Sequence, residues 1–139
     1  QAPPPQTAPP TGPAAPGDDH VDLNAWQAIR ARQRPGQPDL LHKALSLYLP
    51  HADAQLIQLQ QAVAGADIQS VKTIAHMMKS STAQLGAPRL ADLYAKIETT
   101  CRAGAVDNLP DLCGHLIPEH RAVCTLMRQE LNRAGRSAA

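Results

Sequence analysis

The 139-residue sequence contains no phenylalanine, and only 2% of its residues are aromatic. Strands of a sheet are usually rich in aromatic and β-branched residues, so this shortage argues against an all-β protein. The three cysteines are an odd number at irregular spacing and do not form a disulfide framework, which favours a reducing, cytoplasmic compartment. Alanine, leucine and glutamine are abundant instead, and this composition favours helices.

The sequence also lacks an excess of charge and a long apolar run. Thirteen basic and twelve acidic residues give a net charge of +1, so no broad electrostatic field points to nucleic acid or to a membrane surface. No segment approaches the roughly 20 apolar residues that span a bilayer, and the start carries no charged-then-apolar signal sequence. We therefore expect a monomeric domain with no nucleic-acid partner and no direct membrane contact.

Proline is distributed unevenly along the chain. The first sixteen residues, QAPPPQTAPPTGPAAP, hold seven of the thirteen prolines and no charged side chain. Such a composition favours extended polyproline II and cannot form a core. We predict a Pro-rich linker over residues 1–18, a folded domain over 19–134 and a frayed tail over 135–139.

Apolar residues recur at steps of three and four in the folded part, which is typical of amphipathic helices. Capping residues and glycines separate these segments, and Pro50 marks either a kink or a break within the first long one. The expected helices cover residues 21–32, 39–65, 67–86, 88–104 and 108–134. Because the connections are short, we predict an antiparallel up-down four-helix bundle with an additional short N-terminal helix.

One polar group interrupts the bundle pattern, in the segment IAHMMKSSTAQLGA at residues 74–87. His76 follows a core position, Ala75, and is therefore rotated about 100° from the buried stripe onto the shoulder of its helix. The residues expected around it as a shallow, positively charged binding surface are Lys72, Met77, Lys79, Ser80, Ala83 and Gly86, with Leu41 or Leu45 as further apolar contributors.

A carboxylate is expected at the same height as this histidine. Glu98 and His76 each lie eleven residues from Ala87, at the centre of the turn, so both should be about 16 Å from it on antiparallel helices. A hydrogen bond from one ring nitrogen to Glu98 would fix the tautomer and leave the other nitrogen as a nucleophile. An exposed imidazole beside Lys79 suits phosphoryl acceptance, because the lysine can neutralise the incoming oxygens.

These residues resemble the signature of the histidine-containing phosphotransfer (HPt) domain, A-H-x-L-K-G-S-[SA]-x-x-[LVI]-G-A followed by x-x-L and a later L-E. The positions that match are Ala75, His76, Lys79, Ser81, Leu85, Gly86, Ala87, Leu90 and Glu98. The resemblance implies that His76 is phosphorylated and that the partners are receiver domains of a hybrid kinase and of a response regulator. It also implies that the domain ends a hybrid sensor histidine kinase, tethered to the inner membrane through that parent.

Two departures of this segment from the family pattern matter. Ser80 replaces the usual glycine, which adds a hydroxyl that either contacts the phosphoryl group or obstructs a partner. Met78 replaces leucine, a mild change at a core position. The chain contains no P-loop or glycine-rich nucleotide loop, so we expect a phosphocarrier that has no ATP site or cofactor of its own and uses Mg²⁺ supplied by the receiver.

Other readings of the sequence remain. A helical bundle that only docks a partner would need neither His76 nor Lys79. The phosphoacceptor hairpin of a histidine kinase usually has an acidic residue after the histidine, where this chain has Met77. A chemotaxis-kinase phosphotransfer domain shares the histidine and lysine pattern, but normally begins its chain without a Pro-rich spacer.

Cysteine and histidine side chains also share one face of the last expected helix. Cys113, His120 and Cys124 are spaced by seven and four residues, and Cys101 approaches from the neighbouring helix. Thiolate and imidazole ligands can hold zinc. The same positions belong to the apolar stripe, however, and cysteine is among the most frequently buried residue types, so we predict no metal site.

Overall fold

The computed structural model describes residues 20–36 and 39–138, with side chains described as far as Arg133. Within these residues the chain forms five α-helices and one 3-10 turn: α1 (Leu23–Ala31), α2 (Leu40–Ala64), α3 (Ile68–Gln84), α4 (Pro88–Ala103), η1 (Val106–Asn108) and α5 (Leu109–Ala138). The predicted linker, 1–18, lies outside the described residues. The predicted tail is helical as far as Ala138.

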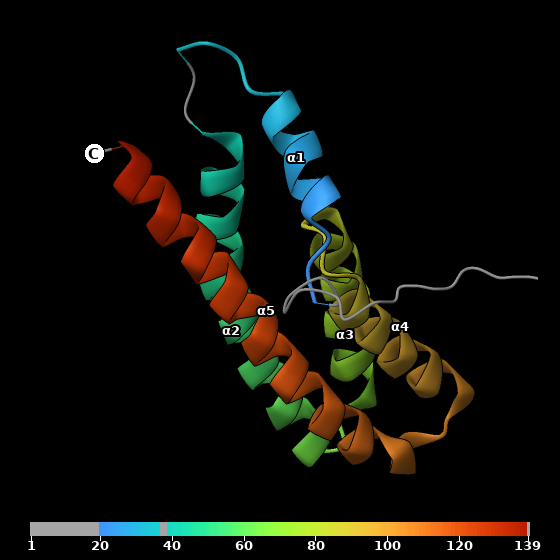
Figure 1. Ribbon diagram of the computed structural model, residues 1–139. Coiled ribbons are helices and arrows are strands. Elements are labelled where there is room, and N and C mark those ends of the chain that lie inside the picture. Colours follow the sequence, from blue (N-terminus) through green and yellow to red (C-terminus); the bar gives the residue numbers. More distant parts are fainter. Residues whose placement is uncertain (1–19, 37–38, 139) are drawn as a thin grey trace, which may run out of the picture.

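The four long helices form an antiparallel bundle (Figure 1). Helix α3 packs against α2 and α4, and α5 closes the bundle by packing against the same two helices. The short α1 lies at one end, where it contacts α2. This arrangement confirms the predicted four-helix bundle with an additional N-terminal helix. None of the described helices is long and apolar enough to cross a bilayer.

The helix ends follow the capping signals of the sequence. The carboxylates of Asp39 and Asp67 each accept a hydrogen bond from the backbone N–H three residues ahead, at 3.0 and 3.2 Å. Pro88 occupies the first turn of α4, and Gly104 ends that helix with a left-handed backbone. Helix α2 continues through Pro50, so the proline does not divide it into two helices.

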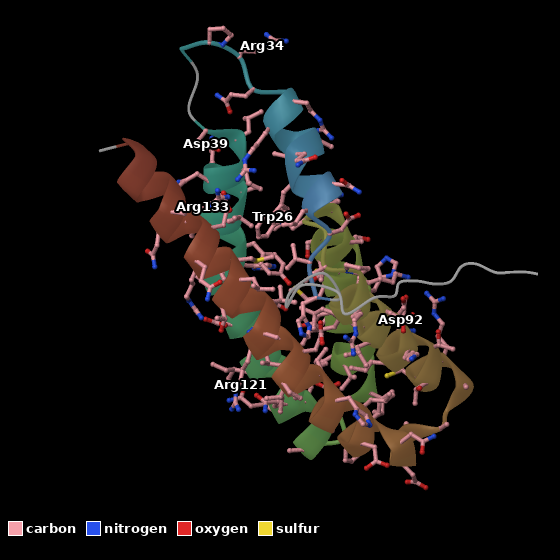
Figure 2. All side chains as sticks on the ribbon, in the orientation of Figure 1. Trp26, Arg34, Asp39, Asp92, Arg121 and Arg133 are labelled. Atoms are coloured by element: carbon pink, nitrogen blue, oxygen red, sulfur yellow. The ribbon has the colours of Figure 1, made fainter. Side chains whose placement is uncertain are left out.

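Helix α1 is fixed to the turn between α3 and α4. The buried Trp26 side chain points from α1 into the molecule (Figure 2), and its Nε1–H donates a hydrogen bond to the carbonyl of Leu85 at 2.8 Å. The backbone N–H of Asp22 donates to the carbonyl of Gly86. These two hydrogen bonds therefore attach the start of α1 to the turn that joins α3 to α4.

Close approach of α1 makes Gly86 irreplaceable by a larger residue. Its φ is +77°, and a Cβ built on it would lie 2.8 Å from the Cβ of Ala25 and 3.0 Å from the carbonyl oxygen of Asp22. We expect Gly86→Ala to lower the free energy of unfolding by about 2–4 kcal/mol, from left-handed strain and overpacking together. Gly104→Ala is the matched control in urea denaturation, because Gly104 has the same φ but open space around it. Equal losses in the two variants would contradict the close approach.

Candidate functional site

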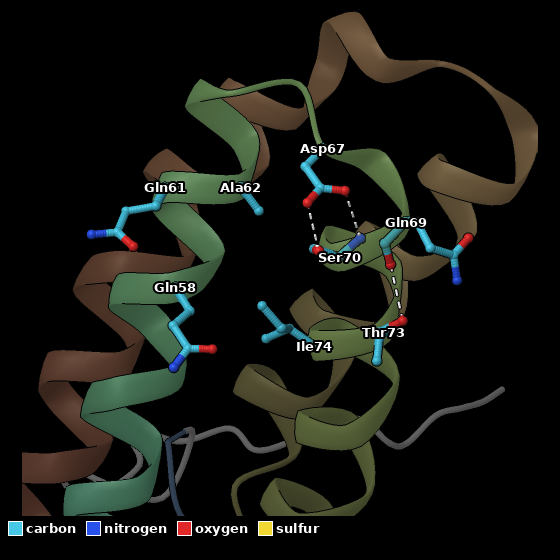
Figure 3. Close-up of a pocket in the computed structure, with 8 residues that line it drawn as sticks. All are labelled: Gln58, Gln61, Ala62, Asp67, Gln69, Ser70, Thr73 and Ile74. Atoms are coloured by element: carbon cyan, nitrogen blue, oxygen red, sulfur yellow. Dashed lines mark hydrogen bonds between the residues drawn. The ribbon is translucent and has the colours of Figure 1, made fainter.

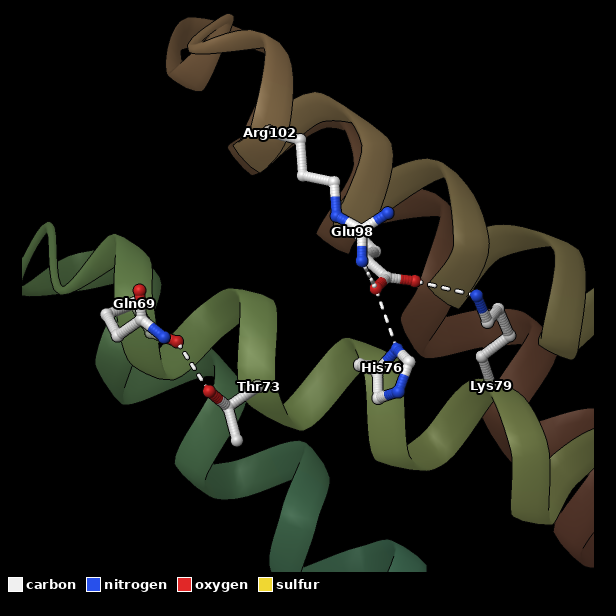
Figure 4. A network of polar contacts seen from close by, with 6 residues as sticks. All are labelled: Gln69, Thr73, His76, Lys79, Glu98 and Arg102. Atoms are coloured by element: carbon white, nitrogen blue, oxygen red, sulfur yellow. Dashed lines mark hydrogen bonds and ion pairs between the residues drawn. The ribbon is translucent and has the colours of Figure 1, made fainter.

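The carboxylate of Glu98 contacts three basic side chains, those of a histidine, a lysine and an arginine (Figure 4). His76 Nδ1 lies 2.7 Å from Glu98 Oε2, and Lys79 Nζ donates to Oε1 at 2.8 Å. Arg102 Nη2 donates to Oε2 at 2.7 Å. Glu98 itself is buried, whereas 60% of the His76 side chain is exposed. The site is thus an open imidazole anchored on an enclosed carboxylate.

The pairing follows from the lengths of α3 and α4. His76 and Glu98 are equally far from the turn at Ala87, and the two antiparallel helices bring them to the same height. Each follows a buried residue, Ala75 or Ile97, so each side chain leaves the core at the seam between the helices. The predicted contact is therefore confirmed.

The ionised carboxylate of Glu98 determines which ring nitrogen of a neutral His76 carries the proton. The hydrogen bond from Lys79 lowers the pKa of Glu98, burial opposes this, and the His76 hydrogen bond and the Arg102 charge lower the pKa further. An ionised carboxylate only accepts hydrogen bonds, so the proton of a neutral ring is on Nδ1. Nε2 then carries a lone pair and lies on the side of the ring away from Glu98 (Figure 4).

The lowered pKa of Glu98 also makes stability depend on pH. Because the folded state favours the ionised form, its contribution is complete above the ordinary value of about 4.5 and is lost as the pH falls through the lower folded-state pKa. We expect the wild type to lose more stability than Glu98→Gln between about pH 5 and pH 3 in urea denaturation. Parallel losses in both proteins would show that Glu98 does not contribute.

Comparison with known proteins identifies the family of the chain. The Hpt domain profile matches residues 43–137. The chain belongs to the Hpt domain family. Its function is histidine phosphotransfer in a phosphorelay. Hpt domains are phosphocarriers rather than kinases, and they interact with receiver domains of two-component systems.

A solved structure supports the fold of this Hpt domain. The chain resembles the crystal structure of histidine-containing phosphotransfer protein B (HptB) from Pseudomonas aeruginosa PAO1, with a TM-score of 0.76 and 24% sequence identity. The likeness covers 82% of this chain and 96% of the other. No curated protein sequence matches the chain.

The surface around His76 contains most of the residues expected there. Met77, Ser80 and Ala83 are exposed on α3, and Lys72 is half-buried one turn before His76. Met77 offers an apolar contact with 45% of its surface exposed. These residues and His76 define one continuous face of α3.

Three other surface predictions are wrong. Gly86 is buried beneath α1, because the segment from Asp22 to Ala25 crosses the turn, and it cannot line a docking surface. Leu41 and Leu45 are only 2% and 0% exposed. They project from α2 into the core rather than toward His76, because they belong to the apolar stripe of that helix.

Arg102 is the site residue that the sequence reasoning missed. It lies one turn beyond Glu98 on α4. The sequence could have indicated this contact, because an acid and a base spaced i,i+4 on a helix often form an ion pair. Its guanidinium shares the oxygen Oε2 with the histidine ring. Arg102 thereby helps to keep the carboxylate ionised.

The Hpt domain also has a shallow hollow of about 450 Å³ between α2 and α3 (Figure 3). Asp67 lines it, but both of its oxygens are engaged with Ser70, whose backbone N–H and hydroxyl donate to them. Thr73 donates to the carbonyl of Gln69 at 2.9 Å. These polar groups are already hydrogen-bonded to one another and to the backbone at the start of α3, so we assign the hollow no part in phosphotransfer.

Proposed function

We propose that Nε2 of His76 accepts a phosphoryl group from an aspartate of one receiver domain and passes it to an aspartate of another. The observation that carries this proposal is the contrast between the two ring nitrogens: Nδ1 is bound to the buried Glu98, and Nε2 lies on the far side of a ring whose side chain is 60% exposed. A convex, accessible imidazole suits reaction with a group presented by a second protein, because that protein can bring the remaining catalytic parts.

The transfer is an in-line displacement at phosphorus. The Nε2 lone pair forms the N–P bond as the bond from phosphorus to the aspartyl oxygen breaks, and the aspartate leaves as a carboxylate. The ring becomes a phosphorylated imidazolium that still carries its proton on Nδ1. Its positive charge develops 2.7 Å from Glu98 Oε2, so the carboxylate stabilises it. The return of the phosphoryl group reverses these steps.

Lys79 is proposed to stabilise the phosphoryl group. Its Nζ is held 2.8 Å from Glu98 Oε1, and the side chain is 37% exposed, so the ammonium can approach an anion on the neighbouring imidazole. Lys79 has three N–H donors and can share them between the carboxylate and phosphoryl oxygens. The hydroxyl of Ser80, on the next turn of the same face, is the second proposed phosphoryl contact.

We propose that the receiver supplies the Mg²⁺ ion and that the phosphotransfer site holds no cofactor. We further propose that the parent protein is a hybrid sensor histidine kinase with this domain in the cytoplasm. Membership of the Hpt domain family supports both proposals, because its members work with receiver domains of two-component systems. The isolated domain is expected to be a monomer.

Glu98→Gln is expected to slow phosphoryl acceptance by about 10- to 100-fold, the range found when the partner that orients a metal-bound imidazole is removed. Glutamine keeps the shape but loses the charge that stabilises the imidazolium. The rate is measured by quenched-flow transfer from a phosphorylated receiver. Asp92→Asn, which removes an exposed carboxylate on the same helix, is the control and should transfer at the wild-type rate. An unchanged rate in Glu98→Gln would contradict the role of the carboxylate.

The proposed function is tested by mixing the full chain with a panel of receiver domains carrying ³²P-labelled aspartyl phosphate. Phosphate on this chain should be labile in acid and stable in base, as expected for phosphohistidine, and it should pass to a second, unphosphorylated receiver. A bundle that only docks its partners would bind a receiver without taking label. That result across the panel would overturn the phosphocarrier assignment.

A further inference from the structure

A second cluster of reactive side chains joins α2 to α5, apart from the His76 face. His120 Nε2 lies 2.8 Å from Asp53 Oδ1 and 3.5 Å from Cys124 Sγ. The three ligand-type atoms all lie within 4.8 Å of one another. Asp53 is on α2, and the other two residues are one turn apart on α5. No step of the proposed phosphotransfer uses them.

We propose that Asp53, His120 and Cys124 bind one zinc-like divalent transition-metal ion between α2 and α5. This site shares His120 and Cys124 with the four residues considered from the sequence, for which we predicted no metal. Cys101 and Cys113 do not belong to the cluster, and Asp53, which is 67 residues before His120 in the chain, takes their place. Metal binding here would be a function beyond phosphotransfer.

One of the ligand separations already matches what a tetrahedral ion requires, and the others can reach it by a small movement of Asp53. Zinc bonds of about 2.0–2.3 Å to nitrogen, oxygen and sulfur place neighbouring ligand atoms about 3.2–3.8 Å apart. The distance from His120 Nε2 to Cys124 Sγ is already 3.5 Å, and the distance from Nε2 to Asp53 Oδ1 must increase from 2.8 Å. Asp53 is 46% exposed and can make this movement, whereas the two α5 ligands are nearly enclosed.

The surroundings provide a fourth position and support for the carboxylate. A hollow of about 540 Å³ opens beside the cluster, so solvent can supply the remaining ligand. Arg128 Nη2 lies 3.4 Å from Asp53 Oδ2, the oxygen that does not face His120, and so it orients the carboxylate from outside. Arg121, which projects from α5 in Figure 2, also lines this hollow.

Metal binding must displace a proton from the thiol. Burial, and then the charge of Asp53, raise the pKa of Cys124 to about 11, so the free thiol is protonated at neutral pH. On binding, the metal–sulfur bond replaces the S–H bond and the proton passes to solvent. The neutral ring of His120 donates its Nε2 proton to Asp53 Oδ1 in the metal-free protein. To bind the ion, the ring must lose this proton to solvent and take one up on Nδ1, which has no hydrogen-bond partner within the described part of the chain and so holds no competing contact.

The ligand types select the class of ion. A thiolate, an imidazole and a carboxylate suit Zn²⁺ and Co²⁺, whereas Mg²⁺ and Ca²⁺ prefer sites made of oxygen ligands. The ion would connect two helices that otherwise meet through side-chain packing and these polar contacts. Binding should therefore raise the melting temperature of the bundle.

Titration of the reduced, untagged full chain with Co²⁺ tests the site. We expect one equivalent to bind and to produce thiolate-to-cobalt charge-transfer absorption together with the visible bands of tetrahedral cobalt. Zn²⁺ should displace the cobalt, remove both signals and raise the melting temperature. Binding without a thiolate signal, or no binding at micromolar protein and metal, would overturn the proposal.

Variants assign the signal to the cluster. Cys124→Ala should abolish the charge-transfer band and weaken Zn²⁺ affinity by about 100-fold or more, and Asp53→Asn should weaken it by about 10-fold or more, since even outer partners of metal ligands contribute 10- to 100-fold. Cys113→Ala, at another buried cysteine on α5, is the control and should bind like the wild type. Asp53→Asn changes a partly exposed residue and should fold, so unchanged affinity in it would contradict the proposal even if Cys124→Ala were unstable.

Discussion

His76→Gln is expected to abolish phosphoryl acceptance from every receiver that phosphorylates the wild-type chain. Glutamine offers an amide in place of the imidazole lone pair, so the N–P bond cannot form. The His76 side chain is 60% exposed, and its replacement should change the free energy of unfolding by less than about 1 kcal/mol. Transfer of ³²P from the phosphorylated receiver, with the reaction followed by gel, measures the loss.

A second exposed histidine provides the matched control. His51 lies on α2, and His51→Gln makes the same chemical change away from Glu98. The control should accept label at the wild-type rate. Labelling of His76→Gln at that rate would show that another residue accepts the phosphoryl group. Circular dichroism of both variants would show whether either had lost its helices.

Trp26→Ala is expected to lower the free energy of unfolding by about 3–5 kcal/mol, as is usual when a buried tryptophan is truncated. The ring is 3% exposed, and its Nε1–H satisfies the carbonyl of Leu85. The change leaves a cavity beneath α1 and removes a hydrogen bond from a buried acceptor. Urea denaturation followed by circular dichroism measures the loss, because Trp26 is the only tryptophan and the variant has no indole fluorescence.

Trp26→Phe separates the two contributions. Phenylalanine fills most of the cavity but cannot donate to Leu85, so the variant should lose about 1–3 kcal/mol, the usual cost of leaving one buried polar group unpaired. A loss below about 1 kcal/mol in Trp26→Ala would show that α1 contributes little to the stability of the bundle.

The bundle itself could be predicted from the sequence because its signals are local. Aspartates at the starts of α2 and α3, Pro88 at the start of α4 and Gly104 after its end fix the helix limits within a few residues. The contact between His76 and Glu98 could be predicted for a similar reason. Equal distances along two helices from one short turn give equal heights, whatever the rest of the chain does.

Contacts between segments far apart in the chain could not be predicted in this way. The burial of Gly86 depends on α1, which reaches the turn from more than 60 residues away, and nothing in the segment around Gly86 indicates that approach. Asp53 approaches His120 and Cys124 because of the packing of α2 on α5. Helical periodicity shows which face of each helix is buried, but not which residue of the next helix it meets.

The attachment of α1 to the α3–α4 turn has a consequence for the alignment of His76 with Glu98. Hydrogen bonds from Asp22 and Trp26 hold successive carbonyls, so the hairpin cannot absorb an added residue by sliding. One residue inserted into the turn before α4 would carry Glu98 about 1.5 Å along and about 100° around its helix. The imidazole would then lose its anion, and the same rotation would carry the buried Ile97 out of the core, so the length of this loop sets both the pairing of His76 and the packing of α4.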